Sequence, residues 1–158
     1  MHHIIYDIMR YYKYLIQKET EGSAVKDTAE DFGMYEMESK FYGTATVKDV
    51  AKRDWHDEDG DDEFVPSVQR YKAIDAEVKF GFKGDKYSAN AAIKKFMEYL
   101  NGGTMKVYDE YNHIGRQNVR FQGISDDAEL VRDKDGDILI IKVKLKINDP
   151  VTDIILTK

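Results

Sequence analysis

The stretch that decides the fold is "AIDAEVKFGFK", residues 73–83, in which apolar and polar side chains alternate. Apolar residues occupy every even position from Ile74 to Phe82, and charged residues or glycine occupy the odd positions. A period of two is typical of a β-strand with one face in the core and the other in water. We therefore expect a strand of an antiparallel sheet here, because such sheets commonly leave one face solvated.

A second alternating run, "LIIKVKLKIND" at residues 139–149, repeats this pattern. Its odd positions from Leu139 to Ile147 are apolar, while its outward positions are mostly polar and begin with Ile140. Three outward residues form what we call the lysine stripe: Lys142, Lys144 and Lys146. Such a stripe is typical either of an edge strand protected against aggregation or of a surface that receives acidic groups.

One helix is predicted between these two strands, over about residues 88–100. In "SANAAIKKFMEYLNGG" (88–103), Ser88 stands at the N-cap position and two glycines end the pattern. Apolar residues recur at i, i+3, i+4 and i+7, starting at Ile93. We expect Phe96 and Leu100 to pack on the apolar faces of the two strands.

The remaining segments predict a β-rich fold. Strands are expected at about 105–108, 118–122 and 128–132, with a hairpin turn at Asp135-Gly136. "DFGMYEMESKFYG" (31–43) indicates a turn and a strand, and "IIYDIMRYYKYLI" (4–16) fits a strand or a helix. The expected fold class is mainly β, an antiparallel β-sandwich or small barrel with one flanking α-helix. We expect an N-terminal segment at 1–25 for which the sequence does not decide between strand and helix, and a single β domain at 26–158 with an arm at about 48–66.

The composition limits the classes of function. The 158 residues fit one domain and include no cysteine, which excludes disulfides and thiolate metal sites. A net charge of −6 argues against a general nucleic-acid binder, which needs a basic face. We expect no export signal and no membrane partner, because no apolar run approaches the roughly 18 residues of a membrane span. The eleven tyrosines and seven phenylalanines fit an aromatic core, a partner surface or a ligand-binding β domain.

The acidic run "DEDGDDE" at 57–63 raises the question of a cation site. Asp57, Asp59 and Gly60 fit positions three, five and six of an EF-hand, but Trp55 and Pro66 would then stand at the first and last ligand positions. A cation-dependent enzyme or calcium-binding module using this loop is therefore kept as the alternative function. We assign no catalytic, cofactor-binding or metal residue, because exposed acids give no environment that separates their pKa values and no histidine has a metal-ligand spacing.

A subunit interface is the third interpretation of this stretch. Trp and Arg anchor protein interfaces more often than other residues, although Trp55 can also be a lid on its own core. The acidic residues complement the lysine stripe, and in a ring of identical subunits the arm of one copy can meet the stripe of the next. The candidate interface residues are Arg53, Asp54, Trp55, Asp57, Asp59, Asp61, Lys142, Lys144 and Lys146.

The order of these elements resembles the N-terminal domain of phage distal tail proteins, which is close to the tail-tube fold. The resemblance covers about residues 26–150 and includes Arg53 and Gly60 in the arm and the Asp149-Pro150 pair after the last strand. It implies a non-enzymatic subunit without cofactor, assembled in the bacterial host cytoplasm as a hexameric ring around the tail channel of the virion or prophage particle. Its partners would be further copies of itself and other tail proteins, with a tail-tube or tail-completion role as the near alternative. No sugar binding is expected, because the carbohydrate-binding-like C-terminal domain of many distal tail proteins has no counterpart here.

Overall fold

The computed structural model of the chain describes residues 13–39, 41, 44–84, 88–125, 128–134 and 136–158. The two described helices are α2 (Thr28–Phe32) and α3 (Ala89–Leu100). The described strands are β1 (Tyr14–Lys18), β2 (Lys26–Asp27), β3 (Tyr35–Ser39), β4 (Lys52–Arg53), β5 (Asp62–Glu63), β6 (Ile74–Gly84), β7 (Thr104–Asp109), β8 (Ile114–Ile124), β9 (Glu129–Asp133) and β10 (Gly136–Ile147).

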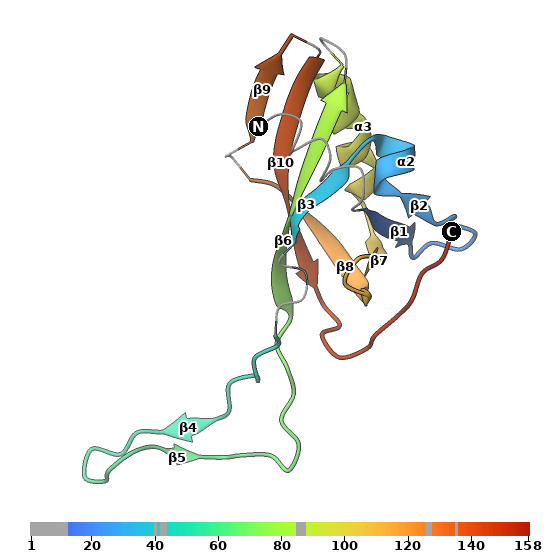
Figure 1. The fold of residues 1–158 in the computed structure, drawn as a ribbon. Helices are drawn as coiled ribbons and strands as arrows, with labels where there is room; N and C mark the ends of the chain where they lie inside the picture. Colours follow the sequence, from blue (N-terminus) through green and yellow to red (C-terminus); the bar gives the residue numbers. More distant parts are fainter. Residues whose placement is uncertain (1–12, 40, 42–43, 85–87, 126–127, 135) are drawn as a thin grey trace.

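One antiparallel sheet contains eight of these strands, in the order β2-β1-β7-β8-β10-β6-β3, with β9 also paired to β10. Strand β10 pairs with β6 along its whole length. Its other edge pairs with β9 over Gly136 to Ile140 and with β8 over Val143 to Ile147. The predicted fold class, antiparallel β with one substantial flanking helix, is confirmed (Figure 1).

The alternation in the two long strands has the expected structural basis. The apolar positions of β6 and β10 face the same core, and Val78 and Val143 are paired in the register and buried. One detail of the prediction was wrong. Ile140, expected on the outward face of β10, is buried, as is Ile138 on the same face. Alternation tells which residues share a face, and only the later positions of this face carry lysines.

Helix α3 begins and ends within a residue of the prediction. Ser88 occupies the N-cap position, but its side chain makes no capping hydrogen bond. Phe96 is fully buried, with its ring edge-on to Phe80 at a centroid distance of 5.3 Å. Leu100 is buried in the same cluster. The expected packing of the helix on the sheet is therefore confirmed.

Two elements near the N-terminus complete the sheet. The segment 4–16 fitted a strand or a helix, and its end is the start of β1 (Tyr14–Lys18), which pairs with β7 inside the sheet. Residues 1–12 lie outside the described residues. Helix α2 was not predicted and precedes the expected turn and β3. Asp27 caps it by accepting hydrogen bonds from the main-chain N–H groups of Ala29 and Glu30. Gly33 ends it in the left-handed conformation that favours glycine.

The sheet curls so that strands far apart in its order meet. Tyr14 of β1 hydrogen-bonds through its hydroxyl to Ser39 of β3, and its ring lies edge-on to Phe80 of β6 at 5.7 Å. We call this contact between β1 and β3 the seam. It brings β1 against the strand at the other end of the sheet order and closes the core between them. The other predicted strands are found as β7, β8 and β9, and Asp135 of the predicted hairpin turn lies outside the described residues.

Candidate assembly interface

The acidic stretch is part of an arm, residues 46–73, that leaves the sheet after β3 and returns to it at β6 (Figure 1). Within it the chain folds back as a two-stranded ribbon in which Lys52 pairs with Glu63 and Arg53 with Asp62. Main-chain hydrogen bonds extend this ribbon towards the sheet, from Lys72 N–H to the carbonyl of Thr46 at 2.8 Å and from Phe64 N–H to that of Ala51 at 2.9 Å. In the structure the arm is thus a paired ribbon along parts of its length.

Trp55 lies in the ribbon itself, which excludes the interpretation of this residue as a lid on its own core. It remains 42% exposed, and its indole N–H donates a hydrogen bond to Asp62 at 3.3 Å. The guanidinium of Arg53 lies 5.2 Å from the centroid of the indole ring, within the range of a cation–π contact. Arg53 and Trp55 therefore form one stacked unit on the arm.

The acidic side chains of the arm are exposed. Asp54, Asp57 and Asp59 are in solvent, and Asp61 makes an ion pair with Lys52 at 3.5 Å. Across the part of the chain that the structure describes, no three His, Asp or Glu side chains are grouped so that they could hold a metal ion. Likewise, none of the described helices is long and apolar enough to cross a membrane.

The lysine stripe lies on an interior strand, so the interpretation as a protected edge strand was wrong. Lys144 stands directly opposite Glu77 of β6, and Lys146 opposite Asp75, whereas Lys142 faces Lys79. Opposite charges at such cross-strand positions attract one another. Part of the positive charge of the stripe is therefore balanced within its own sheet.

This face of the sheet is also hollowed. A cavity of about 520 Å³ lies between β6, β8 and β10 and is lined by Asp75, Ala76, Glu77, Gln122 and Lys144. A smaller one of about 90 Å³ is lined by Glu38, Glu77, Lys79 and Lys142. The stripe thus borders a hollowed surface of mixed charge.

Sequence analysis missed the apolar part of the arm. Phe64 is 75% exposed, and Val65, Val68 and Tyr71 on the returning side are exposed as well. The signal was present in "EFVPSVQRY" (63–71), the apolar portion of an otherwise charged arm. Contiguous exposed apolar residues mark surfaces that bind other molecules.

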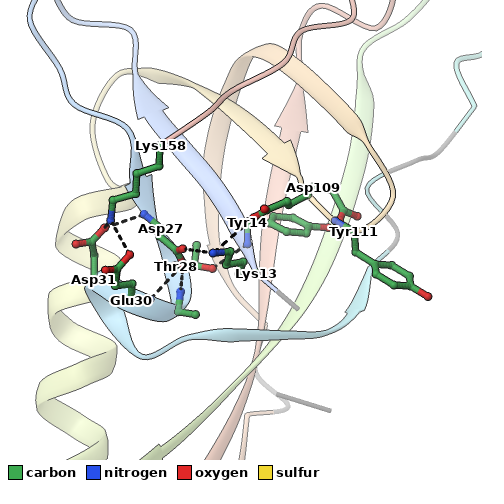
Figure 2. Close-up of polar contacts among 11 residues, drawn as sticks. Lys13, Tyr14, Asp27, Thr28, Glu30, Asp31, Asp109, Tyr111 and Lys158 are labelled. Atoms are coloured by element: carbon green, nitrogen blue, oxygen red, sulfur yellow. Dashed lines mark hydrogen bonds and ion pairs between the residues drawn. The ribbon is translucent and has the colours of Figure 1, made fainter. Parts of the chain in front are cut away.

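The C-terminal residues cover the outer face of β1, β7 and β8 without forming a strand. Leu156 packs against Leu15 and Tyr108, and Figure 2 shows Lys158 beside α2, where it forms ion pairs with Asp31 at 2.7 Å and Glu30 at 3.2 Å. Gly115 makes this path possible, because the carbonyl of Ile154 lies where the Cβ of any larger residue would stand.

Helix α2 connects that segment to β1. Lys13 forms an ion pair with the buried Asp27 at 2.8 Å, and the Thr28 hydroxyl accepts a hydrogen bond from the main-chain N–H of Tyr14 (Figure 2). The contact with Asp27 is the main cause that raises the pKa of Lys13. Asp31 binds Lys158 and also accepts from the main-chain N–H of Asp27, and both contacts lower its pKa. These contacts hold the body of the fold together on the side that Figure 2 shows.

Two acidic residues are buried beside Tyr14. Asp109, at the end of β7, accepts hydrogen bonds from the main-chain N–H groups of Tyr111 and Asn112 and so holds the turn into β8. Glu36 of β3 is 6% exposed, and its pKa is raised to about 7, first by burial and then by the charges of Asp109 and Glu38. Burial and the charge of Asp109 also raise the pKa of Tyr14. Glu36 and Asp109 therefore lie in the main sheet, in β3 and β7, and not in the arm.

Comparison with models of protein families finds no match, and no curated protein matches the chain. Among solved structures the chain is similar to SPP1 Dit, whose crystal structure is described as a paradigm of hub adsorption apparatus in phages that infect Gram-positive bacteria. The match has a TM-score of 0.57 and 13% sequence identity, and it covers 87% of this chain and 50% of the Dit chain. The chain therefore spans about half the length of that protein. What the likeness shows is the fold, which this chain shares with a hub protein of a phage tail.

Proposed function

We propose that the chain is a structural, non-enzymatic subunit of a phage or prophage tail, which assembles with copies of itself as a ring around the tail channel. The single observation that carries the proposal is the arm, a paired ribbon whose residues from 51 to 73 are exposed in the isolated chain, on a fold shared with a phage-tail hub protein. A lone two-stranded ribbon is at best marginally stable in water, so such an arm gains most when it lies against another molecule.

The partners in this proposal are further copies of the chain and other proteins of the tail. Six copies is the number that the resemblance to distal tail proteins implies, and the place of action is the virion tail after assembly in the bacterial cytoplasm. The arm supplies Arg53, Trp55 and the acidic residues Asp54, Asp57, Asp59 and Asp61, and the lysine stripe is the predicted receiving surface. A head-to-tail contact of this kind closes a ring when the rotation from one subunit to the next is a whole fraction of 360°.

The experiment is the measurement of mass in solution by light scattering, for the wild type, Trp55→Ala and Lys144→Glu, alone and with the neighbouring tail proteins. We expect rings for the wild type, monomers for Trp55→Ala and partial assembly for Lys144→Glu. The reason is that a buried aromatic anchor contributes more than an exposed ion pair, which is worth only ~0–1 kcal/mol. A wild type that stays monomeric at high concentration with its tail partners present would contradict the proposal. Calorimetric titration of the same samples with calcium, magnesium and manganese tests the cation-dependent alternative, which requires tight one-to-one binding.

A further inference from the structure

The arm consists of two halves with opposite chemistry. The arm tip, residues 52–63, has two basic residues against seven acidic ones, a net charge of −5. The arm root, residues 46–51 and 64–73, has three basic residues, Lys48, Arg70 and Lys72, against Asp49 alone, a net charge of +2. Tip and root belong to one ribbon that folds back on itself, so each copy presents both charges on one extended element.

The arm root is also where the exposed apolar side chains of the arm gather. Phe64, Val65 and Val68 follow β5 directly, and Tyr71 and Val47 form an isolated bridge at the end of the arm nearest the sheet. In the isolated chain each of these five residues is at least 43% exposed. Because the ribbon is only two strands wide, its own body cannot cover them, and their burial needs a second molecule.

The basic character of the root continues onto the sheet. Ile74, the first residue of β6, pairs with Ile147, and Lys146 is the next position along β10. Arg120 of β8 stands opposite Lys146 in the register. The basic residues of the root therefore lead into the end of the lysine stripe, where Asp75 and Glu77 stand opposite Lys146 and Lys144.

We propose that the acidic tip of one copy lies along the root of the arm of the next copy, so that the arms overlap head to tail around the ring. The occupant is a second copy of this chain, because the tip carries the charge that the root lacks and the Arg53–Trp55 pair offers an aromatic surface for Phe64, Val65 and Val68. The twelve residues of the tip, folded back on themselves, reach at most about 20 Å, a length that covers part of a neighbour's root. This inference rests on the proposed function and names the contact that assembly uses.

The geometry also assigns separate roles to the two surfaces. The root supplies the apolar contact that holds the tip, and the end of the lysine stripe supplies charge beside it. Complementary charge mainly guides encounter and register, whereas the buried apolar side chains set the rate of dissociation. Each arm gives its tip to one neighbour and receives the tip of the other on its root, which makes the contact heterologous.

Cross-linking between engineered cysteines tests the contact, because the natural chain contains none. The double variant Glu58→Cys with Ser67→Cys places one thiol in the tip and one in the root, both on exposed residues. Treatment of the assembled protein with a short bismaleimide is expected to give a ladder of covalent multimers up to the full ring. Each single variant is expected to give no ladder, because a head-to-tail contact never brings two identical thiols together.

Two matched pairs locate the contact. Glu58→Cys with Lys94→Cys, an exposed position on α3, is expected to give no ladder. Glu58→Cys with Lys144→Cys tests direct docking of the tip on the centre of the stripe. Suppose that the wild type assembles, but that only the stripe pair forms the ladder or that the α3 pair forms it as well as the tip–root pair does. Either result overturns the tip-to-root contact and leaves the proposed function standing. A wild type that never assembles with its tail partners overturns both.

Exchange of charges gives a second readout. Lys48→Glu with Arg70→Glu is expected to weaken assembly about tenfold or more, since each exposed pair contributes up to ~1 kcal/mol. Adding Asp57→Lys and Asp59→Lys in the same chain is expected to restore assembly, because tip and root are then complementary again with the signs reversed. Failure of the exchange to restore what the root variant loses would contradict the inference.

Discussion

Glu36 offers the sharpest test of the folded structure, because a buried carboxyl at the seam of the sheet makes stability depend on pH. The group is 6% exposed, and its pKa rises from 4.5 to about 7, chiefly through burial and further through the charges of Asp109 and Glu38. The nearby hydroxyl of Tyr14 is uncharged over this range, and burial raises the pKa of that group further. The charges of Asp109 and Glu38 thus both oppose the ionisation of Glu36.

The sign of the effect follows from where the proton binds more tightly. The folded state holds the proton of Glu36 up to about pH 7, whereas the unfolded chain releases it near 4.5. The contribution of this group to stability is therefore complete below pH 4.5 and is lost as the pH rises to about 7. The difference between the two pKa values corresponds to about 3 kcal/mol of unfolding free energy, since one pKa unit is worth about 1.4 kcal/mol.

Glu36→Gln removes the titration while keeping the size and shape of the side chain. The wild type should lose about 3 kcal/mol of unfolding free energy as the pH rises from 4.5 to 8, and the variant should not. The difference in stability therefore shifts in favour of the variant by about 3 kcal/mol over this range. Urea unfolding followed by far-UV circular dichroism, at protein concentrations below assembly, measures both profiles. Glu98→Gln, which changes an exposed carboxyl on α3, is the control and should follow the wild type. If Glu36→Gln shows the same decline with pH as the wild type, the assignment of a buried, protonated Glu36 is refuted.

Two further predictions concern the core and the arm. Phe96→Ala should lower the free energy of unfolding by about 3–5 kcal/mol, because it removes a fully buried ring packed on Phe80 and Phe32. The control Met97→Ala, on the partly exposed side of α3, should lower it far less. Urea unfolding measures both, and equal losses would contradict the core assignment. A protease specific for glutamate should cut the monomer first within residues 52–63, because this charge-rich tip buries too little apolar surface to offset its ordering entropy, and assembly should protect the same bonds. Mass spectrometry of the first fragments identifies the cut, and a tip that resists cleavage in a demonstrated monomer would count against its role in assembly.

The parts of the fold that the sequence predicted correctly are those in which one local pattern has one structural meaning. Strand β6 and helix α3 show regular periods of two and of 3.6 with a core on one side, and both lie where expected. Helix α2 was missed because five residues are too few for a helical period to emerge. Its only signal was Asp27 before Glu30, a capping pattern inside a segment dominated by the aromatic residues that follow.

Features that depend on which strands become neighbours were harder to predict. The three lysines of β10 were assigned correctly to one face, but whether that strand lay at an edge depended on its pairing with β8 and β9, whose sequence patterns are weaker. The same holds for Glu77 and Asp75, whose positions opposite Lys144 and Lys146 follow from the register and not from any local spacing. Burial of Glu36 likewise requires the curling of the sheet that brings β1 against β3.

For the arm, composition indicated its charge but not how its residues pair. Its acids and its single Trp suggested a charged segment with an anchor, and its contact with another copy stays a prediction. Residues 46–53 pair with residues 62–72, which gives a ribbon with a negative end and an apolar, positive end. No local sequence pattern predicted this pairing. An isolated hairpin of this width has little to hold it in water. In the proposed ring each half of the arm meets the opposite half of a neighbour, so that the pairing within one arm and the proposed pairing between arms belong to the same assembly.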